Sequence, residues 1–355
     1  MHQRNPDPVS AAVARLGAMN STSTNTAHAI IQTDPKDPSS LEWQAIDKPQ
    51  PAEGEALVRI HYAGLNRADT LQAQGHYPPP KGVTETIGLE AAGVVENPNG
   101  ATKPDGTPWQ EGEEVAVLLS GGGYATHAAV PAGQLMPIPK GYSLAEAASV
   151  VEVACTVWSN VADIAGLREG ELALFHGGGG GIGLFATQYA HAIGAKVAVT
   201  AGSQAKLDVC RSYGADTLIN YKEEDFAEVL RELGGADVIL DIIGAKYLDS
   251  NVKALAMDGR MVIIGMQGGV KGELNIARLL SKRGTISATG LRYRDTEDKA
   301  RIVRGTLEEM WPLLESGKIS HHIDRTVPIQ DAAAAHQALL AGEVTGKVVF
   351  EVPQS

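Results

Sequence analysis

Residues 171–183 read Glu-Leu-Ala-Leu-Phe-His-Gly-Gly-Gly-Gly-Gly-Ile-Gly, a short apolar run followed by five consecutive glycines. Gly178, Gly180 and Gly183 fill the pattern Gly-x-Gly-x-x-Gly. In that pattern the first glycine permits a tight turn, the second lets the backbone approach a pyrophosphate, and the third lets helix and strand pack closely. The pyrophosphate would lie at a helix N-terminus, where free N–H groups favour an anion. By itself, the same run is also typical of a flexible loop.

The residues around the glycines favour a nucleotide-binding motif over a flexible loop. Residues 172–175 predict a buried strand, 184–193 a helix closed by Gly194, and 196–200 a second strand, which completes a βαβ unit. Further strands are predicted at 217–220, 236–243, 260–266 and 285–291, and helices at 204–213, 223–233, 245–257 and 275–282. With strand 171–176 they predict an α/β fold, a doubly wound Rossmann domain with a six-stranded parallel sheet.

Short strands with glycine and proline punctuation precede this region. Residues 56–62 alternate between apolar and polar, and 114–119 with 124–130 predict a hairpin around 121–123. Residues 143–165 have helical spacing, with Ser143 as N-cap, and a further helix is predicted from Thr296 to about Glu315. The tail predicts strands at 326–329 and 347–352, which we expect to pair with the first domain.

These patterns predict two domains and a leader. Residues 1–26 are expected to be disordered, 27–150 with 310–355 to form a β-rich catalytic domain, and 151–309 to form the nucleotide-binding domain. The first domain is then discontinuous, because the tail returns to it after the glycine loop and its sheet.

Composition excludes several classes of protein. The formal net charge of -12, with no basic stripe to offset it, argues against nucleic acid as the main partner. No apolar run approaches the roughly 20 residues of a membrane span, so no membrane association is predicted. Cys155 and Cys210 are too few for a disulfide framework. They fit a reducing compartment, and residues 1–26 lack the apolar core of a signal peptide, so we expect a cytoplasmic protein.

Several motifs occur in order along the chain: Gly-Leu-Asn-Arg-Ala-Asp at 64–69, Gln-Gly-His-Tyr-Pro-Pro-Pro at 74–80, Gly-Leu-Glu-Ala-Ala-Gly at 88–93 and Gly-Gly-Tyr-Ala at 122–125. With the glycine loop, they make the chain from 27 to 352 resemble the medium-chain dehydrogenase/reductase superfamily, in its zinc-free, zeta-crystallin-like NADPH:quinone oxidoreductase branch. One departure is that the family mixes Ala or Ser among the loop glycines, whereas this loop is all glycine.

The resemblance implies a GroES-like N-terminal domain, a Rossmann domain and a cleft between them. It implies NADPH as the hydride donor, quinones or related α,β-unsaturated carbonyls as acceptors, and a homodimer paired through the sixth Rossmann strand. Two alternatives stay open. One is an enoyl-thioester reductase, and the other is a non-catalytic NADPH-binding protein of crystallin type, because a fold does not fix a function.

Three residues are expected beside the acceptor. Tyr77 matches the family's residue next to the nicotinamide and would polarise the acceptor carbonyl, although a tyrosine before three prolines is also typical of a packed turn. Asn66 would offer amide donors in the cleft. Thr156 matches a threonine at the nicotinamide end, and its alternative is a helical threonine bonded to its own backbone. Glu90 is expected to be a structural carboxylate, and Cys155 a buried hydrophobic residue.

No metal site is predicted. Zinc members of the superfamily share this architecture, and a catalytic zinc needs three protein ligands. Asn66 stands where those members carry Cys, and Leu89 where they carry His. The ten histidines show no ligand spacing, and two cysteines cannot form a four-cysteine lobe.

The cofactor is expected along the carboxyl ends of the strands, outside the sheet. The glycine loop would hold the pyrophosphate through Gly178, Gly180, Gly181, Ile182 and Gly183. The ends of the fifth and sixth strands would line the nicotinamide side with Gly265, Met266, Gln267, Leu291 and Arg292.

The second strand predicts a preference for NADPH over NADH. NAD-type sites carry an acidic residue about 20 positions beyond the glycine loop, and this chain has Gly202 there. Ser203 and Lys206 would bind the 2′-phosphate, and Tyr221 matches the family's phenol beside it. The alternative for Ser203 is a helix cap, and for Lys206 an ordinary surface lysine.

Overall fold

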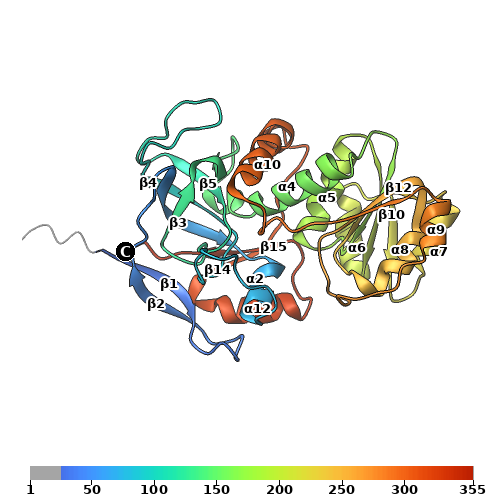
Figure 1. Cartoon of the computed structure of the whole chain (residues 1–355), viewed down its shortest axis with the longest axis horizontal. Helices are drawn as coiled ribbons and strands as arrows, with labels where there is room; N and C mark the ends of the chain where they lie inside the picture. Colours follow the sequence, from blue (N-terminus) through green and yellow to red (C-terminus); the bar gives the residue numbers. More distant parts are fainter. Residues whose placement is uncertain (1–24, 355) are drawn as a thin grey trace, which may run out of the picture.

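The computed structural model describes residues 25–354. The described chain is built on two large sheets, one β-rich at the left of Figure 1 and one covered by helices at the right. Residues 1–24 of the predicted leader lie outside the described residues, and Thr26 already begins strand β1 (Thr26–Gln32). No helix in residues 25–354 has the length and apolar character needed to cross a membrane.

The predicted Rossmann sheet is confirmed. Its six parallel strands lie in the order β10-β9-β8-β11-β12-β13. The strands are β8 (Leu172–His176), β9 (Lys196–Ala201), β10 (Thr217–Asn220), β11 (Ala236–Asp241), β12 (Leu255–Ile263) and β13 (Thr285–Ala288). The predicted sixth strand was too long, because pairing with β12 ends at Ala288 and leaves Leu291 outside it.

Helices cover both faces of this sheet. They are α5 (Gly181–Ala192), α6 (Gln204–Ser212), α7 (Phe226–Glu232), α8 (Leu248–Ala254) and α9 (Ile276–Ser281), with a 3-10 turn η3 (Ala245–Tyr247) before α8. The predicted helix 245–257 was too long at its C-terminal end, since Leu255 pairs with Ala236 and starts β12.

The β-rich part contains a seven-stranded sheet with the path β14-β15-β3-β4-β5-β7, with β6 paired to β3, and a separate β1-β2 pair. Its strands are β2 (Leu41–Asp47), β3 (Glu55–Gly64), β4 (Glu90–Asn97), β5 (Glu114–Leu118), β6 (His127–Pro131), β7 (Leu135–Pro137), β14 (Ile323–Pro328) and β15 (Lys347–Glu351). The predicted hairpin of 114–130 was wrong, because β5 pairs with β4 and β7 whereas β6 pairs with β3.

The tail returns to the first sheet as expected. β15 runs antiparallel to β3, with Val349 opposite Gly64, and β14 is parallel to β15. Figure 1 shows this red segment crossing back to the β-rich part, where the chain ends. A helix that the sequence did not suggest, α12 (Ala332–Leu340), follows the 3-10 turn η4 (Ile329–Asp331).

The segment that joins the two parts is interrupted. The single helix predicted for 143–165 is instead α3 (Leu144–Ala147), α4 (Val151–Val157) and a π-helical turn η2 (Trp158–Ile164). Ser143 caps α3 through its predicted capping box with Glu146. The second start is possible because the Glu90 carboxylate on β4 accepts the backbone N–H of Glu152, at 2.8 Å, which is a donor that no residue of the helix itself can satisfy.

A similar break divides the long helix predicted from Thr296. It consists of α10 (Thr296–Glu309) and α11 (Trp311–Glu315), and Pro312 stands in the first turn of α11. Proline lacks a backbone N–H and cannot lie inside a continuous helix without cost. Two further short elements, α2 (Arg67–Ala73) and the 3-10 turn η1 (Ala132–Gln134), lie in the β-rich part.

Candidate active site

The glycine loop connects β8 to α5 at the carboxyl edge of the sheet. Gly177 has φ +70°, so it makes the turn off the strand, one residue earlier than the sequence pattern suggested. A β-carbon at Gly183 would lie 2.5 Å from the Gly177 carbonyl oxygen, and one at Gly178 would lie 2.7 Å from Cβ of Val199. Close packing therefore requires both glycines. Gly180 is the N-cap of α5, and a β-carbon there would meet only the Gly177 oxygen, at 3.4 Å.

The C-terminal segment crosses this loop. The Gly346 N–H donates to the Gly179 carbonyl oxygen at 2.9 Å, and Gly346 forms an isolated bridge with Gly180. A β-carbon at Gly181 would collide with the Lys347 side chain, at 2.6 Å. Ile182 is half-buried beside it. The glycine loop is therefore tied directly to the strand that enters the β-rich sheet.

The predicted adenosine end is assembled by β9 and β10. Gly202 follows β9, and a β-carbon there would lie 2.4 Å from the Tyr221 hydroxyl, so the phenol fills the space that an acidic side chain would need. Tyr221 is 46% exposed, so its hydroxyl is open to a ligand. Ser203 is exposed and caps α6 by accepting from the Lys206 N–H. The alternative role of Ser203 as a cap is therefore real and leaves its own hydroxyl hydrogen free.

Lys206 makes contacts that the sequence did not suggest. Its Nζ donates to the carbonyl oxygens of Gly342 and Val344, at 2.8 and 2.9 Å. Its alkyl chain covers Gly179. In this arrangement the ammonium holds the C-terminal segment, and its assignment to a 2′-phosphate stays a prediction.

The ends of β12 and β13 differ in character. Gly265 packs on the Ile242 carbonyl, whereas Met266 is 56% exposed and Gln267 is exposed. Leu291 is buried. The exposed methionine is available to a ligand, and the buried Leu291 would act through shape alone.

Arg292 is 3% exposed, and its guanidinium donates to residues of the β-rich part. Nε donates to the Ser120 carbonyl at 2.7 Å, Nη1 to the Tyr77 carbonyl at 2.9 Å, and Nη2 to Oε1 of Gln72 at 2.6 Å. Its guanidinium also lies over the Tyr77 ring, 5.4 Å from the centroid. The structure thus makes Arg292 a clamp between the two parts of the chain, and its predicted contact with the cofactor stays a prediction.

Tyr77 lies in the loop after α2 and is half-buried. Its ring packs edge-on against Tyr293, with centroids 5.0 Å apart, and its hydroxyl lies close to Gly290. Burial raises the pKa of Tyr77 above its ordinary value, and the charges of Tyr293 and Glu152 raise it further, while Arg292 opposes them. The phenol therefore stays protonated and can donate a hydrogen bond at any physiological pH. No residue that the structure describes accepts that hydrogen.

Asn66 joins a buried cluster. Its Nδ2 donates to Oε1 of Glu90 at 2.8 Å, and its Oδ1 accepts from Nζ of Lys347 at 2.6 Å. The same ammonium donates to Glu90 at 2.6 Å and to the Leu65 carbonyl at 2.9 Å. The exposed fractions of the Lys347 and Glu90 side chains are 6% and 0%. Asn66 is thus oriented from both ends of its amide, and Glu90 is the structural carboxylate expected.

Thr156 lies one turn into α4 and touches a second carboxyl group. Its hydroxyl donates to Oε1 of Glu152 at 3.0 Å, rather than to its own backbone as the alternative proposed. Burial raises the pKa of Glu152 to about 7, and the negative charge of Glu90 adds to the shift, while Lys347 and the Thr156 hydroxyl oppose it. Sequence reasoning missed Glu152, because a glutamate in the first turn of a helix is ordinary.

Other residues weighed from the sequence have structural roles. Cys155 is completely buried, and burial raises the pKa of its thiol to about 12, so it is a hydrophobic residue as predicted. Leu89 is also buried. Among residues 25–354, no group of three or more His, Cys, Asp or Glu side chains could hold a metal ion. Absence of a metal in the working protein stays a prediction.

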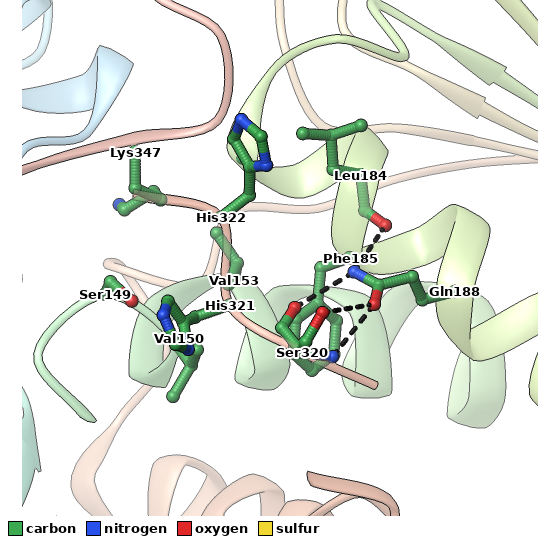
Figure 2. A pocket seen from close by; sticks show the side chains of 11 residues that line it. Ser149, Val150, Val153, Leu184, Phe185, Gln188, Ser320, His321, His322 and Lys347 are labelled. Atoms are coloured by element: carbon green, nitrogen blue, oxygen red, sulfur yellow. Dashed lines mark hydrogen bonds between the residues drawn. The ribbon is translucent and has the colours of Figure 1, made fainter. Parts of the chain in front are cut away.

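A small cavity lies between α4, α5 and residues 320–322 (Figure 2). Gln188 closes it by donating to the Ser320 carbonyl at 3.0 Å and accepting from the Ser320 N–H at 2.8 Å. Its volume of about 10 Å³ suits about one water molecule. A nicotinamide or a quinone cannot enter it, so this cavity is not the acceptor site, and the assignment of the acceptor to Tyr77 and Thr156 stays a prediction.

The glycine loop, the six-stranded parallel sheet and the separate seven-stranded sheet define a medium-chain dehydrogenase/reductase. A family described as "Alcohol dehydrogenase GroES-like domain" matches residues 52–140, and one described as "Zinc-binding dehydrogenase" matches residues 181–315. "Quinone oxidoreductase" of Pseudomonas aeruginosa is 31% identical over 317 residues, which cover 88% of this chain and 96% of that protein. The chain belongs to the quinone oxidoreductase family within this superfamily.

Two other similarities bear on function. "Mycocerosic acid synthase-like polyketide synthase" of Mycobacterium tuberculosis is 29% identical over 326 residues, which are 90% of this chain but 15% of that protein. A crystal structure of Escherichia coli quinone oxidoreductase complexed with NADPH superposes with a TM-score of 0.80 at 27% identity, over 92% of this chain and 99% of that chain. The predicted family and fold are confirmed.

Proposed function

We propose that this protein is an NADPH-dependent, metal-free reductase that transfers a hydride to quinones or related α,β-unsaturated carbonyls. The observation that supports the proposal is a connected group of side chains. The Asn66 amide donates to Glu90, Glu90 accepts the Glu152 N–H, and Glu152 accepts from the Thr156 hydroxyl. The Tyr77 hydroxyl, which stays protonated, lies within reach of the Glu152 charge. The relatives named as quinone oxidoreductases support it. The predicted division into residues 27–150 with 310–355, and 151–309, belongs to the same proposal.

The residues at the start of α5 are compatible with binding of NADPH. A β-carbon at Gly180, the N-cap of α5, would meet only the Gly177 oxygen, and the N-terminus of a helix favours an anion such as the pyrophosphate. When bound, NADPH supplies the hydride. The chain's own residues then orient the acceptor: Asn66 is held in one amide orientation, and Tyr77 donates to the acceptor oxygen, where negative charge develops.

The test is a panel of acceptors. NADPH consumption is expected with simple quinones and small enones, and exhaustive chelation is expected to leave turnover intact. Loss of turnover on chelation, restored by zinc, would contradict the metal-free mechanism. No consumption with any acceptor, despite NADPH binding, would favour the crystallin-type alternative.

An enoyl-thioester reductase is the second candidate. The observation that favours it is the similarity of 90% of this chain to a segment of a polyketide synthase. Enoyl-CoA thioesters in the same panel decide between the two enzymes, since the favoured acceptor has the higher kcat/KM.

We propose a preference for NADPH over NADH. Gly202 removes the acid that would repel a 2′-phosphate, Tyr221 and Ser203 offer hydroxyl groups, and Lys206 can exchange its carbonyl partners for a phosphate. A hydrogen bond to a charged group contributes roughly 1.5–3 kcal/mol, so the preference is expected to be at least about tenfold.

Lys206→Ala should raise the KM for NADPH and leave that for NADH nearly unchanged. Lys222→Ala, an exposed lysine beside Tyr221, is the matched control. Equal use of both cofactors by the wild type would contradict the assignment.

We propose a homodimer through the β13 edge of the Rossmann sheet. β13 pairs only with β12 among the described strands, and the neighbouring α9 exposes Ile276 (69%) and Leu280 (74%). Soluble proteins seldom leave a sheet edge open, and the exposed apolar side chains of α9 lie beside this one, so a second copy of this chain is the fitting occupant. Sedimentation should show a dimer at micromolar concentration, and Ile276→Glu with Leu280→Glu should give a monomer. A wild-type monomer would contradict the proposal.

We also propose a cytoplasmic location for the protein. The two cysteines, which are free and buried, support it.

A further inference from the structure

We propose that Glu152 supplies the proton that completes reduction of the acceptor, and that the Thr156 hydroxyl passes it on. This inference rests on the proposed function and deepens it, because a hydride alone leaves the acceptor as an anion. Glu152 is then a positioning and proton-storing residue that acts through Thr156, the group that touches the acceptor.

The geometry fixes Glu152 between Glu90 and Thr156. Its backbone N–H is held by Oε2 of Glu90 at 2.8 Å, so the side chain projects from a fixed point at the start of α4. Oε1 accepts from the Thr156 hydroxyl at 3.0 Å. Oε2 is a buried oxygen without a hydrogen-bond partner among the described residues. A buried carboxylate oxygen with no partner is costly, and a proton on it removes much of that cost.

The charges around Glu152 come from four elements. Glu90 on β4 and Lys347 on β15 act in opposite directions on its pKa, and burial acts in the same direction as Glu90. Asp69 on α2 and Tyr77 in the loop after it also lie within reach of its charge. With these groups present, burial raises the pKa of Glu152 to about 7, so the carboxyl group can both hold and release a proton near neutral pH.

The neighbouring acids are less suited to the task. Burial raises the pKa of Tyr77 above its ordinary value and that of Cys155 to about 12, so neither releases a proton at neutral pH. Burial also raises the pKa of Asp69 to about 7, but its carboxylate is bonded to the Asn66 N–H at 2.7 Å and to the Tyr124 hydroxyl at 3.3 Å. It therefore faces the β-rich core rather than Thr156.

The relay depends on the single hydrogen of Thr156. When Glu152 is ionised, that hydrogen is donated to Oε1, as the structure shows. When Glu152 is protonated, its O–H can donate to the Thr156 oxygen, and the threonine hydrogen is free for the acceptor oxygen. The acceptor carbon gains the hydride with its two electrons, the acceptor oxygen takes the threonine hydrogen, and the threonine oxygen takes the Glu152 proton. Glu152 is left as a carboxylate, and its buried Oε2 regains a proton from water that enters between turnovers.

The test is the pH dependence of turnover. In the wild type, kcat with a simple quinone should fall as the pH rises through about 7, because the proton-bearing form of Glu152 is lost. Glu152→Gln keeps a donor for Thr156 but no transferable proton. Its kcat should be about tenfold lower at low pH, below the usual gain from a general acid because water can replace the proton, and should not change with pH. NADPH binding, followed by fluorescence, should be unchanged and reports that the variant is folded.

Two matched comparisons separate the relay from a structural role. Thr156→Ser should keep the pH dependence of kcat, and Thr156→Val should lose it. These two variants test the relay even if Glu152→Gln does not fold. Asp69→Asn, which removes the other carboxyl group with a pKa of about 7, should keep the dependence. Wild-type kcat and pH profile in Glu152→Gln or in Thr156→Val would overturn the relay and leave the proposed function standing. A wild type that consumes no NADPH with any acceptor would overturn both.

Discussion

Replacing Lys347 with methionine is expected to lower the melting temperature by about 10 °C. The ammonium of Lys347 is the only cation within hydrogen-bond distance of Glu90 in the described part of the chain, and the two side chains are 6% and 0% exposed. Methionine fills a similar volume but removes the cation that is paired with the carboxylate, which then keeps only the Asn66 and Glu152 N–H donors. Breaking a buried pair in this way costs about 3–5 kcal/mol, and each kcal/mol corresponds to roughly 2–4 °C in a domain of this size.

The double variant is the informative control. Lys347→Met combined with Glu90→Gln removes both charges, and replacing a buried pair is far less costly than breaking it, so about half of the lost stability should return. Arg231→Met, which breaks an exposed pair with Glu228, should change the melting temperature by at most ~2 °C. Calorimetry checks all three variants. A Lys347→Met protein as stable as the wild type would contradict a stabilising role for the ion pair between Lys347 and Glu90.

The sequence predicted the fold best where an element depends on residues close to it in the chain. Alternating strands and helices after residue 171 predicted the Rossmann sheet, because each βαβ unit carries its own hydrophobic period and its own glycine at the turn. The prediction of helices and strands was wrong where a residue far away in the sequence determines the local structure. The helix of 143–165 is broken because the Glu90 carboxylate, 62 residues before Glu152, satisfies a backbone donor there. The hairpin of 114–130 fails because β6 finds its partner in β3.

The site residues, too, could be predicted only where the signal lies in a local sequence motif. Tyr77, Asn66 and Thr156 could be named because their motifs resemble those of a family, and their roles stay predictions. The structure links Asn66 to Thr156 through Glu90 and Glu152. Lys347 is separated from Glu90 by 257 positions, and a lysine that opens a strand carries no local sign that it will be buried. Lys206 and Arg292 were expected to face the cofactor. In the structure Lys206 donates to two backbone carbonyls of the tail, and Arg292 donates to two backbone carbonyls and the Gln72 side chain in the β-rich part.

Tyr77→Phe is expected to lower kcat by on the order of a hundredfold, the usual effect of removing one donor to a developing oxyanion. The phenol is suited to that role because burial raises its pKa, which keeps the hydrogen in place, and because no described residue accepts it. The ring itself is fixed by other contacts: Tyr293 packs edge-on, and Arg292 lies over its face. Phenylalanine preserves these contacts, so the loss should fall on kcat and spare the KM for NADPH.

Tyr293→Phe is the matched control, since it removes a neighbouring phenol hydroxyl that donates to the Pro78 carbonyl at 3.2 Å. The Tyr293 hydroxyl is already hydrogen-bonded to the loop at Pro78. Its loss removes one exposed hydrogen bond and should change kcat by less than about threefold. The comparison should be made with several quinones and enones, because a donor to the acceptor oxygen acts on each of them. An unchanged kcat for Tyr77→Phe across that panel would mean that the residue only packs, and the charge on the acceptor oxygen would then have to be met by Asn66 and Thr156 alone.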